Sequence, residues 1–193
     1  MSIKKLTAEA HYYDETEWPF SSAFVWEKVL KKEENTFNLF QCADQLRLSG
    51  NYERAHELLS QIELDDLSQD YKYYYFMSLG KLYEDQFNID AAIKAYQECI
   101  TYEFDSTLPY VFLANLLSRQ GQLAEAENIL TQAVNKEGDL DEVYYHLSTT
   151  CARQRKLADA ITAMKKCLDI NESYPNAQAL LEDFKNLKKL KSK

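Results

Sequence analysis

Apolar residues recur along this chain at a fixed interval of 34 residues. The longest series consists of Leu79, Leu113, Leu147 and Leu181. Three parallel series are Ala92, Ala126 and Ala160; Tyr96, Leu130 and Met164; and Cys99, Ala133 and Cys167. Within one interval the apolar positions follow helical spacing, as Phe76, Leu79 and Tyr83 do. A period of this length, with a small residue at one position and large apolar residues at others, predicts a stack of helical hairpins.

Short polar turns divide each interval into two predicted helices. These turns are Gly50-Asn51, Phe87-Asn88, Gly121-Gln122 and Arg155-Lys156. Glycine at such a turn ends a helix at low cost, because it readily adopts a positive φ. The recurring alanines are expected where the two helices of a hairpin cross, since a larger side chain there would separate them. They are Ala55, Ala92, Ala126 and Ala160.

The repeat resembles the tetratricopeptide repeat family, whose pattern is an aromatic residue, Leu-Gly, Tyr, a small residue, an aromatic residue and a closing Pro. The best match reads Phe76, Leu79-Gly80, Tyr83, Ala92 and Tyr96. Four units are in phase, at residues 36–69, 73–106, 107–140 and 141–174, with a three-residue insertion at 64–68. Phe104, Gly138 and Glu172 replace the closing Pro. The resemblance implies an all-α fold: a right-handed superhelical array of antiparallel helix pairs, with about four repeats and a C-terminal capping helix.

Both ends of the chain lie outside these four units. Residues 1–35 do not fit the 34-residue frame and are rich in aromatic residues: Tyr12, Tyr13, Trp18, Phe20, Phe24 and Trp26. Ser21 or Ser22 is expected to cap one helix that runs to about Glu34. This segment either caps the first repeat or lies in a binding groove. The groove could be that of its own chain or that of a neighbouring copy, and the second arrangement would make a homo-oligomer. We favour the cap, because terminal repeats must be sealed. Residues 175–193 are expected to form the closing helix, with Pro175 in its first turn, and a Lys-rich tail.

Composition narrows the classes of partner. The formal net charge is −9, so the protein is expected to repel phosphate backbones, and we expect no nucleic-acid ligand. No apolar run approaches the roughly 18 residues that a membrane-spanning helix needs, and the N-terminus does not read as a secretory signal. We therefore expect a cytoplasmic protein that does not bind membranes.

The residues capable of chemistry are scattered or occupy packing positions. Each cysteine falls at a repeat position that is apolar or small in other units, and no zinc-ligand spacing occurs. The three histidines are far apart in the array. No nucleophile elbow, P-loop or dinucleotide fingerprint is present. The sequence therefore predicts no enzyme activity, no catalytic residues, no metal and no cofactor.

The resemblance also implies a binding groove, because the first helix of each tetratricopeptide hairpin lines the concave face at repeat positions 2, 5, 9 and 12. The candidate residues at these positions are Phe37, Phe40, Asp44, Arg47, Tyr74, Met77, Lys81, Leu108, Val111, Asn115, Tyr145 and Thr149. One edge is apolar and the other polar, and an exposed apolar stripe implies that something covers it. The alternative is that some of these aromatic residues pack between repeats.

The groove chemistry leads to a prediction of function. Adaptors that grip the acidic C-terminus of a chaperone use Lys, Asn and Arg at clamp positions that here hold Phe40, Asp44, Ser78, Leu108 and Phe112, so that clamp is missing. We expect a non-catalytic protein-protein interaction module, an adaptor, scaffold or chaperone-like protein, that binds a peptide or protein segment with apolar anchors. The alternative is a fixed structural subunit of a larger assembly.

Overall fold

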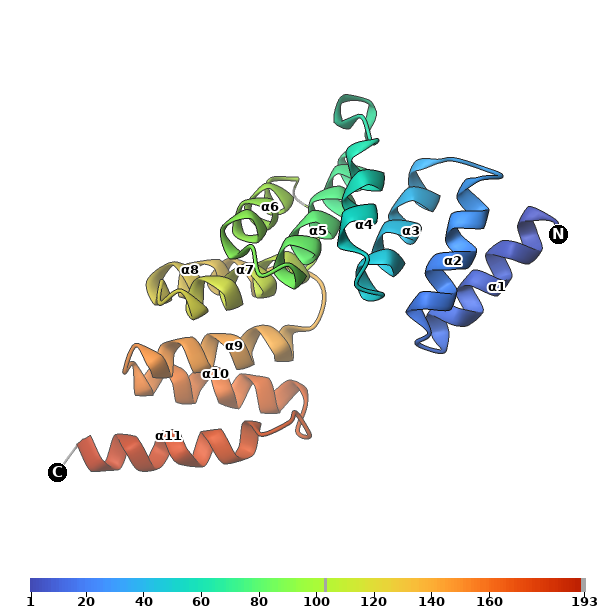
Figure 1. Cartoon of the computed structure of the whole chain (residues 1–193). Helices are drawn as coiled ribbons and strands as arrows, with labels where there is room; N and C mark the ends of the chain where they lie inside the picture. The colour runs from blue at the N-terminus through green and yellow to red at the C-terminus, as the bar shows by residue number, and fades with distance from the viewer. Residues whose placement is uncertain (103, 192–193) are drawn as a thin grey trace. The chain divides into compact units, whose positions relative to one another are not determined.

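The computed structural model describes residues 1–102 and 104–191, and across these residues the chain is helical without any strand (Figure 1). The all-α prediction is therefore confirmed. The α-helices are α1 (Ile3–Glu15), α2 (Pro19–Leu30), α3 (Thr36–Leu48), α4 (Tyr52–Ser60), α5 (Gln69–Asp85), α6 (Ile89–Thr101), α7 (Leu108–Arg119), α8 (Leu123–Ala133), α9 (Leu140–Arg153), α10 (Leu157–Ile170) and α11 (Ala177–Lys191).

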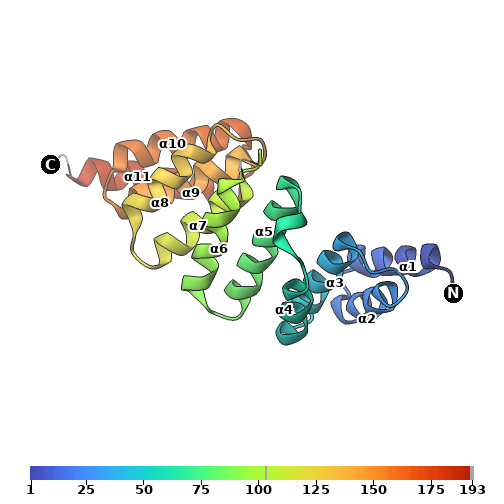
Figure 2. The ribbon, with the colours of Figure 1, turned by 90° about the horizontal axis from the view of Figure 1, so that it is seen from above.

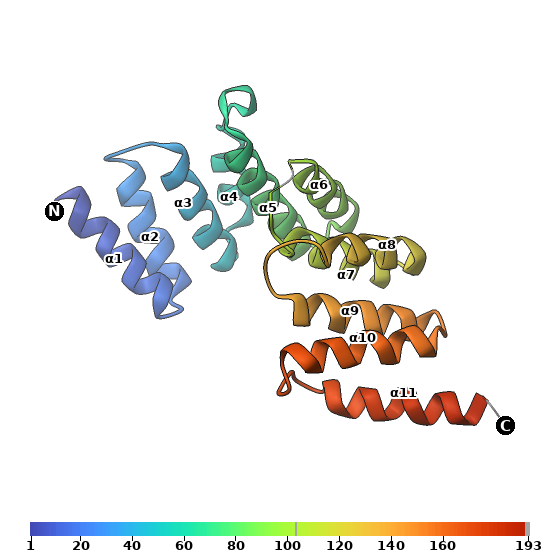
Figure 3. The same ribbon diagram turned by 180° about the vertical axis from the view of Figure 1, so that it is seen from behind.

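The helices belong to two compact units, Met1–Tyr102 and Glu103–Lys193. In the first unit α1 packs on α2, α2 on α3 and α3 on α4, while α5 contacts both α3 and α4 and packs on α6. In the second unit α7 packs on α8, and both of these helices contact α9. Helix α9 packs on α10, and α10 packs on α11. Figures 2 and 3 show the consecutive helices within each unit side by side from two further directions. Neighbouring first helices thus contact one another, α3 with α5 and α7 with α9.

The four predicted turns lie between the helices of a pair, as expected. At the same position in each turn the backbone adopts a positive φ: 80° at Gly50 and 83° at Gly121, but also 59° at Phe87 and 63° at Arg155. Glycine takes this conformation without strain, whereas the Cβ of any other residue meets the backbone. Phe87 and Arg155 therefore hold strained conformations in otherwise regular turns.

We expect Phe87→Gly to stabilise the first unit by roughly 0.5–1 kcal/mol, because a left-handed residue with a side chain costs about 1–2 kcal/mol and glycine's extra freedom in the unfolded chain offsets part of the gain. The Phe87 side chain is 82% exposed, so its removal sacrifices little packing. Urea titration followed by circular dichroism measures the difference. Gln86→Gly is the matched control, since Gln86 has φ −81° and should lose stability. A lower midpoint for Phe87→Gly would contradict the account.

The N-terminal segment forms a pair of helices, α1 and α2, where one capping helix was expected. The expected serine cap is wrong: Trp18 precedes α2, and Ser22 is buried inside the helix. Its hydroxyl donates a hydrogen bond to the Asp14 carboxylate, which also accepts one from Trp26 Nε1 at 3.2 Å. The helix ends at Leu30, before Glu34. Ser22 therefore ties the two helices together.

The α1–α2 pair carries the repeat pattern at a spacing of 33 residues instead of 34. The matching pairs are Leu6 with Leu39, Ala10 with Ala43, Tyr13 with Leu46, Ser22 with Ala55, Trp26 with Leu59 and Val29 with Ile62. Glu17, with φ 57°, occupies the turn position of Gly50. Leu6, Ala10, Trp26 and Val29 are all buried. Residues 1–35 are therefore a further, shortened repeat that stacks on α3.

The insertion and the C-terminal end complete the array. The inserted residues form a short 3-10 helix, Leu64–Asp66, and α5 begins several residues before its repeat unit. Pro175 was expected in the first turn of the closing helix, and this is wrong: α11 begins at Ala177, after Asn176 with φ 61°. Helix α11 packs on α10, and its residues Ala177, Leu181 and Phe184 are buried, whereas Leu187 is exposed. Residues 192–193 of the Lys-rich tail lie outside the described residues.

Candidate binding surface

All twelve predicted groove residues lie on first helices of the repeats. In the first unit, α3 carries Phe37, Phe40, Asp44 and Arg47, and α5 carries Tyr74, Met77 and Lys81. In the second unit, α7 carries Leu108, Val111 and Asn115, and α9 carries Tyr145 and Thr149. Because α3 contacts α5, and α7 contacts α9, each unit presents its own set of these side chains along neighbouring helices.

The apolar residues at repeat positions 2 and 5 have different surroundings. Position 2 is open to solvent: Phe37 is 45% exposed, Tyr74 is 48% exposed, and Leu108 is also exposed. Position 5 is buried in three units, with Phe40 at 8% and both Met77 and Val111 at 5%. In the fourth unit Tyr145 is half-buried, and its ring centroid lies 4.8 Å from that of Tyr174. The expectation that position 5 supplies exposed anchors is therefore wrong for Phe40, Met77 and Val111. Their side chains belong to the packed interior of their units, as in the alternative that some apolar residues pack between repeats.

An aromatic surface joins α3 and α5 in the first unit. Phe40 stacks on Tyr71, with ring centroids 6.1 Å apart and planes 16° from parallel. Tyr71 is exposed and lies one turn before Tyr74, while Phe37 lies one turn before Phe40 and meets Trp26 edge-on. We name the exposed residues Phe37, Tyr71 and Tyr74 the aromatic surface. Sequence reasoning missed Tyr71, because it precedes the repeat unit and lies on the extra turn of α5.

The polar end of this helix pair is held by an internal ion-pair cluster. Arg47 lies 2.9 Å from the Asp44 carboxylate and 2.5 Å from that of Asp85. Burial acts to lower the pKa of Arg47, but the two carboxylates outweigh it and hold that pKa above its ordinary value. Arg47 is therefore engaged by acids of its own chain, and this end of the surface is not a cationic clamp.

The second unit carries a small polar hollow between α7, α8 and α9, with a volume of about 70 Å³. Asn115 and Thr149, predicted for the polar edge, both line it, together with Ala114, Ser118, Leu130, His146, Thr150 and Arg153. The hydroxyls of Ser118 and Thr150 lie 3.3 Å apart. Burial lowers the pKa of His146, so its ring is neutral at neutral pH. The hollow can accept a polar group or a few water molecules, since each water occupies about 30 Å³ in the liquid.

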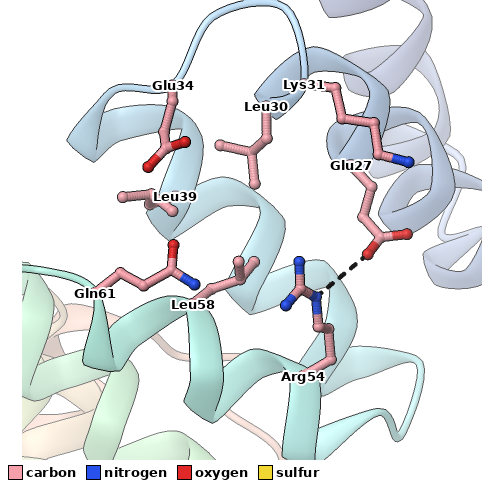
Figure 4. A pocket seen from close by; sticks show the side chains of 8 residues that line it. All are labelled: Glu27, Leu30, Lys31, Glu34, Leu39, Arg54, Leu58 and Gln61. Atoms are coloured by element: carbon pink, nitrogen blue, oxygen red, sulfur yellow. Dashed lines mark ion pairs between the residues drawn. The ribbon is translucent and has the colours of Figure 1, made fainter.

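The first unit also contains a hollow, of about 130 Å³, which is lined by residues of α2, α3 and α4 and of the segments that follow α2 and α4 (Figure 4). Leucines line part of it, and charged or polar side chains surround them: Glu27, Leu30, Lys31, Glu34, Leu39, Arg54, Leu58 and Gln61. The Arg54 guanidinium lies 3.5 Å from the Glu27 carboxylate. No repeat position pointed to this hollow, because it depends on how α2 packs on the following helices, which the sequence pattern did not show.

The four cysteines are buried free thiols, as their repeat positions predict. Burial raises the pKa of Cys42 and of Cys99 to about 12, and those of Cys151 and Cys167 to about 11. The thiols are therefore protonated at neutral pH, and the protonated form is a poor nucleophile and a poor metal ligand. Among the described residues, no cluster of three or more His, Cys, Asp or Glu side chains could hold a metal ion.

We expect the native cysteines to resist a thiol reagent such as 5,5′-dithiobis(2-nitrobenzoate), because the reagent requires an accessible thiolate. After denaturation all four should react at once. The colour yield before and after addition of guanidinium measures this directly. Rapid, stoichiometric modification of the folded protein at pH 7 would contradict the packing role.

Comparisons with known proteins agree with the repeat pattern. Two family models described as tetratricopeptide repeat match residues 84–150 and 141–174, the second covering the same residues as the fourth predicted unit. A comparison with curated proteins found no match. In the part of the chain that the structure describes, no helix combines the length and the apolar character needed to cross a membrane. The cytoplasmic location stays a prediction.

Solved structures share the fold at low sequence identity. TTC0263, a repeat protein of Thermus thermophilus, is 13% identical, with a TM-score of 0.66 over 95% of this chain and 98% of that one. Yeast Tom70 is 19% identical, with a TM-score of 0.77 over 95% of this chain, which spans 40% of Tom70. YrrB, described as having an unusual peptide-binding site, is 14% identical, with a TM-score of 0.64 over 90% of this chain and 88% of that one.

Proposed function

Because the chain belongs to the tetratricopeptide repeat family, whose members are generally non-catalytic interaction modules, we propose that it binds a segment of another protein. The binding face consists of the first helices of each unit, and in the first unit its centre is the aromatic surface of Phe37, Tyr71 and Tyr74. The protein acts as an adaptor or chaperone-like module and performs no chemistry of its own.

The observation that carries this proposal is the exposure of three aromatic rings on two contacting helices. Phe37, Tyr71 and Tyr74 are exposed, although Phe40, which stacks on Tyr71, is buried in the same helix pair. Neighbouring apolar groups that remain in water favour association, because a partner removes them from solvent. Full burial of such a side chain contributes about 1.5–3 kcal/mol, so these half-exposed rings can each supply roughly half of that.

The surroundings indicate the chemistry of the bound segment. Arg47 is already paired with Asp44 and Asp85, so charge contributes little to recognition at the polar end. The hollow of the second unit offers Asn115, Ser118 and Thr149, which suit an uncharged polar group or a main-chain carbonyl. A segment with apolar anchors, extended or helical, fits the aromatic surface of the first unit, and its binding there should depend only weakly on salt.

Selection from a random peptide library tests this function without a known partner. We expect the selected peptides to share apolar or aromatic anchors and to bind with similar affinity in 50 and 500 mM salt. The variant Phe37→Ser with Tyr74→Ser should bind them at least tenfold more weakly at unchanged helical content. The matched control is Phe87→Ser, which removes an exposed phenylalanine outside α3 and α5. Undiminished binding to the double variant would overturn the proposal.

A fixed structural subunit remains the second candidate, and one observation favours it. Phe20 and Phe24 are exposed on α2, a second helix, where a peptide on the first helices would not cover them. The related fold of Cut9 occurs in a solved hetero-tetramer with Hcn1. A surface of this kind suits a contact with a folded partner.

A further inference from the structure

Helix α2 presents a stripe of aromatic and basic side chains to solvent. Phe20 is 75% exposed and Phe24 is 59% exposed, and residues four apart on a helix lie on the same side. The ammonium group of Lys28, one turn further on, lies 3.8 Å from the centroid of the Phe24 ring. Lys31 is exposed on the same side near the end of the helix. We name Phe20, Phe24, Lys28 and Lys31 the α2 stripe.

The other repeats show that packing within a repeat does not require these phenylalanines. The residues at the positions of Phe20 and Phe24 in the other four second helices are Glu53 and Glu57, Asp90 and Lys94, Ala124 and Asn128, and Ala158 and Thr162. All eight are exposed, and none is a large apolar residue. This face of the second helix is therefore a solvent face elsewhere in the chain, and α2 alone carries two large rings there.

The charges along α2 are arranged in a self-complementary order. Glu15 and Glu17, both exposed, lie in and beside the turn that leads into its N-terminal end. The phenylalanines follow, and Lys28 and Lys31 lie toward the C-terminal end. Glu27, on the same side of the helix, is directed toward Arg54 (Figure 4). The sequence of features is acid, aromatic, base.

A two-fold dimer requires a surface that is complementary to itself. If two α2 helices pack antiparallel about a point between the two rings, Phe20 of each copy meets Phe24 of the other. At a rise of about 1.5 Å per residue within the helix, Lys28 then lies about 9 Å from the axis. The turn that holds Glu15 and Glu17 lies beyond the N-terminal end of α2 on the opposite side, so the lysine end of each copy lies toward the acidic turn of the second copy. We propose that the protein forms a symmetric homodimer through this antiparallel contact of the α2 stripe.

The size of the stripe sets the strength of this contact. A buried aromatic side chain covers about 150–250 Å², so the exposed parts of the two rings in each copy together bury about 500 Å² in the dimer. Even with the lysine stems and the adjoining turn, the interface stays below the roughly 1,200 Å² at which stable, specific interfaces begin. The dimer should therefore be weak and dependent on concentration. It leaves the first helices α3 and α5 open, so it is compatible with segment binding there.

Sedimentation velocity of the full chain over a range of concentrations tests the dimer. We expect wild-type protein to shift from monomer to dimer between about 5 and 500 µM, and Phe20→Ser with Phe24→Ser to remain monomeric at every concentration with an unchanged circular dichroism spectrum. Phe87→Ser, which removes another exposed phenylalanine, should dimerise as the wild type does. A wild-type protein that stays monomeric at 500 µM overturns the proposal. Binding of the monomeric protein to anionic phosphatidylglycerol vesicles, lost in the Phe20→Ser, Phe24→Ser variant, would also overturn it.

Charge reversal tests the antiparallel order. In low salt, Glu15→Lys with Glu17→Lys and, separately, Lys28→Glu with Lys31→Glu should each weaken self-association at least tenfold, because like charges then face each other at both ends. A mixture of the two variants should form heterodimers, since one copy then carries only lysines and the other only acids at these ends. If each variant dimerises as the wild type does, or if the mixture stays monomeric, the proposed geometry is wrong.

Discussion

Gly80→Ala is expected to destabilise the first unit by about 1–3 kcal/mol, because it overfills a closed contact between α5 and α6. A Cβ atom on Gly80 would lie 2.3 Å from Cε1 of Tyr96, closer than real Cβ contacts allow. The Tyr96 ring cannot move aside easily, since the side chain is fully buried and its hydroxyl donates a hydrogen bond to Glu84 at 3.3 Å. Urea unfolding followed by circular dichroism provides the measurement.

The other repeats indicate which second substitution should rescue this variant. In two of the other repeats the position of Gly80 holds alanine and the position of Tyr96 holds leucine, namely Ala43 with Leu59 and Ala114 with Leu130. The N-terminal repeat instead combines Ala10 with Trp26. Tyr96→Leu alone should also destabilise, by about 1–3 kcal/mol, because it leaves a cavity opposite the glycine. The double variant should then be more stable than the sum of the two single changes predicts, by about 1 kcal/mol or more. Strict additivity would show that the two positions do not share one packing volume.

Asp14→Ala should cost about 2–4 kcal/mol in the N-terminal repeat, since it removes the acceptor of two buried donors and each unsatisfied donor costs about 1–3 kcal/mol. The hydroxyl of Ser22 and Nε1 of Trp26 both donate to the Asp14 carboxylate, and both side chains are fully buried. Trp26 is a direct probe, because its fluorescence should shift to the red if water reaches the indole.

Asp14→Asn is the matched control for that change. The amide retains one oxygen acceptor of similar size, so it should lose less than half of the stability that the alanine variant loses. In a repeat array each repeat depends mainly on its neighbours, so the early loss should be confined to α1 and α2 and visible as faster hydrogen exchange there. Equal stability of the aspartate, asparagine and alanine variants would show that the network contributes nothing.

The repeat period predicted the helix pairs well because it reflects a strict packing requirement. Ala92, Ala126 and Ala160 are fully buried in second helices, and the turns at Gly50 and Gly121 have the expected positive φ. The N-terminal pair was missed for a simple reason: one residue is lacking between α2 and α3, so every match lies 33 residues away and a fixed period of 34 passes over it.

Local rules failed where tertiary contacts decide the outcome. Ser22 has the right side chain for a helix cap, but the helix already begins at Pro19. The buried hydroxyl of Ser22 instead donates a hydrogen bond to the Asp14 carboxylate. Pro175 is compatible with a first helical turn, yet the left-handed backbone of Asn176 delays α11.

The candidate surface was predicted only in part. The choice of first helices followed from the repeat, but the exposure of each position depends on how closely neighbouring first helices approach. The repeat pattern does not contain that distance. In the structure Phe40 and Val111 are buried, whereas Phe37 and Tyr74 remain exposed to solvent. The position of Tyr71 could be predicted only with the length of α5, which begins at Gln69, before the repeat unit that starts at Tyr73.

Site-specific photo-crosslinking tests whether the first helices of the repeats bind a protein segment. A benzoylphenylalanine placed at Tyr74 on α5 should crosslink to a selected peptide in high yield, whereas the same probe at Lys94, exposed on the second helix α6, should not. Excess unlabelled peptide should abolish the product at position 74. Crosslinking at position 94 with equal or greater yield would contradict the account and place the binding face on the second helices.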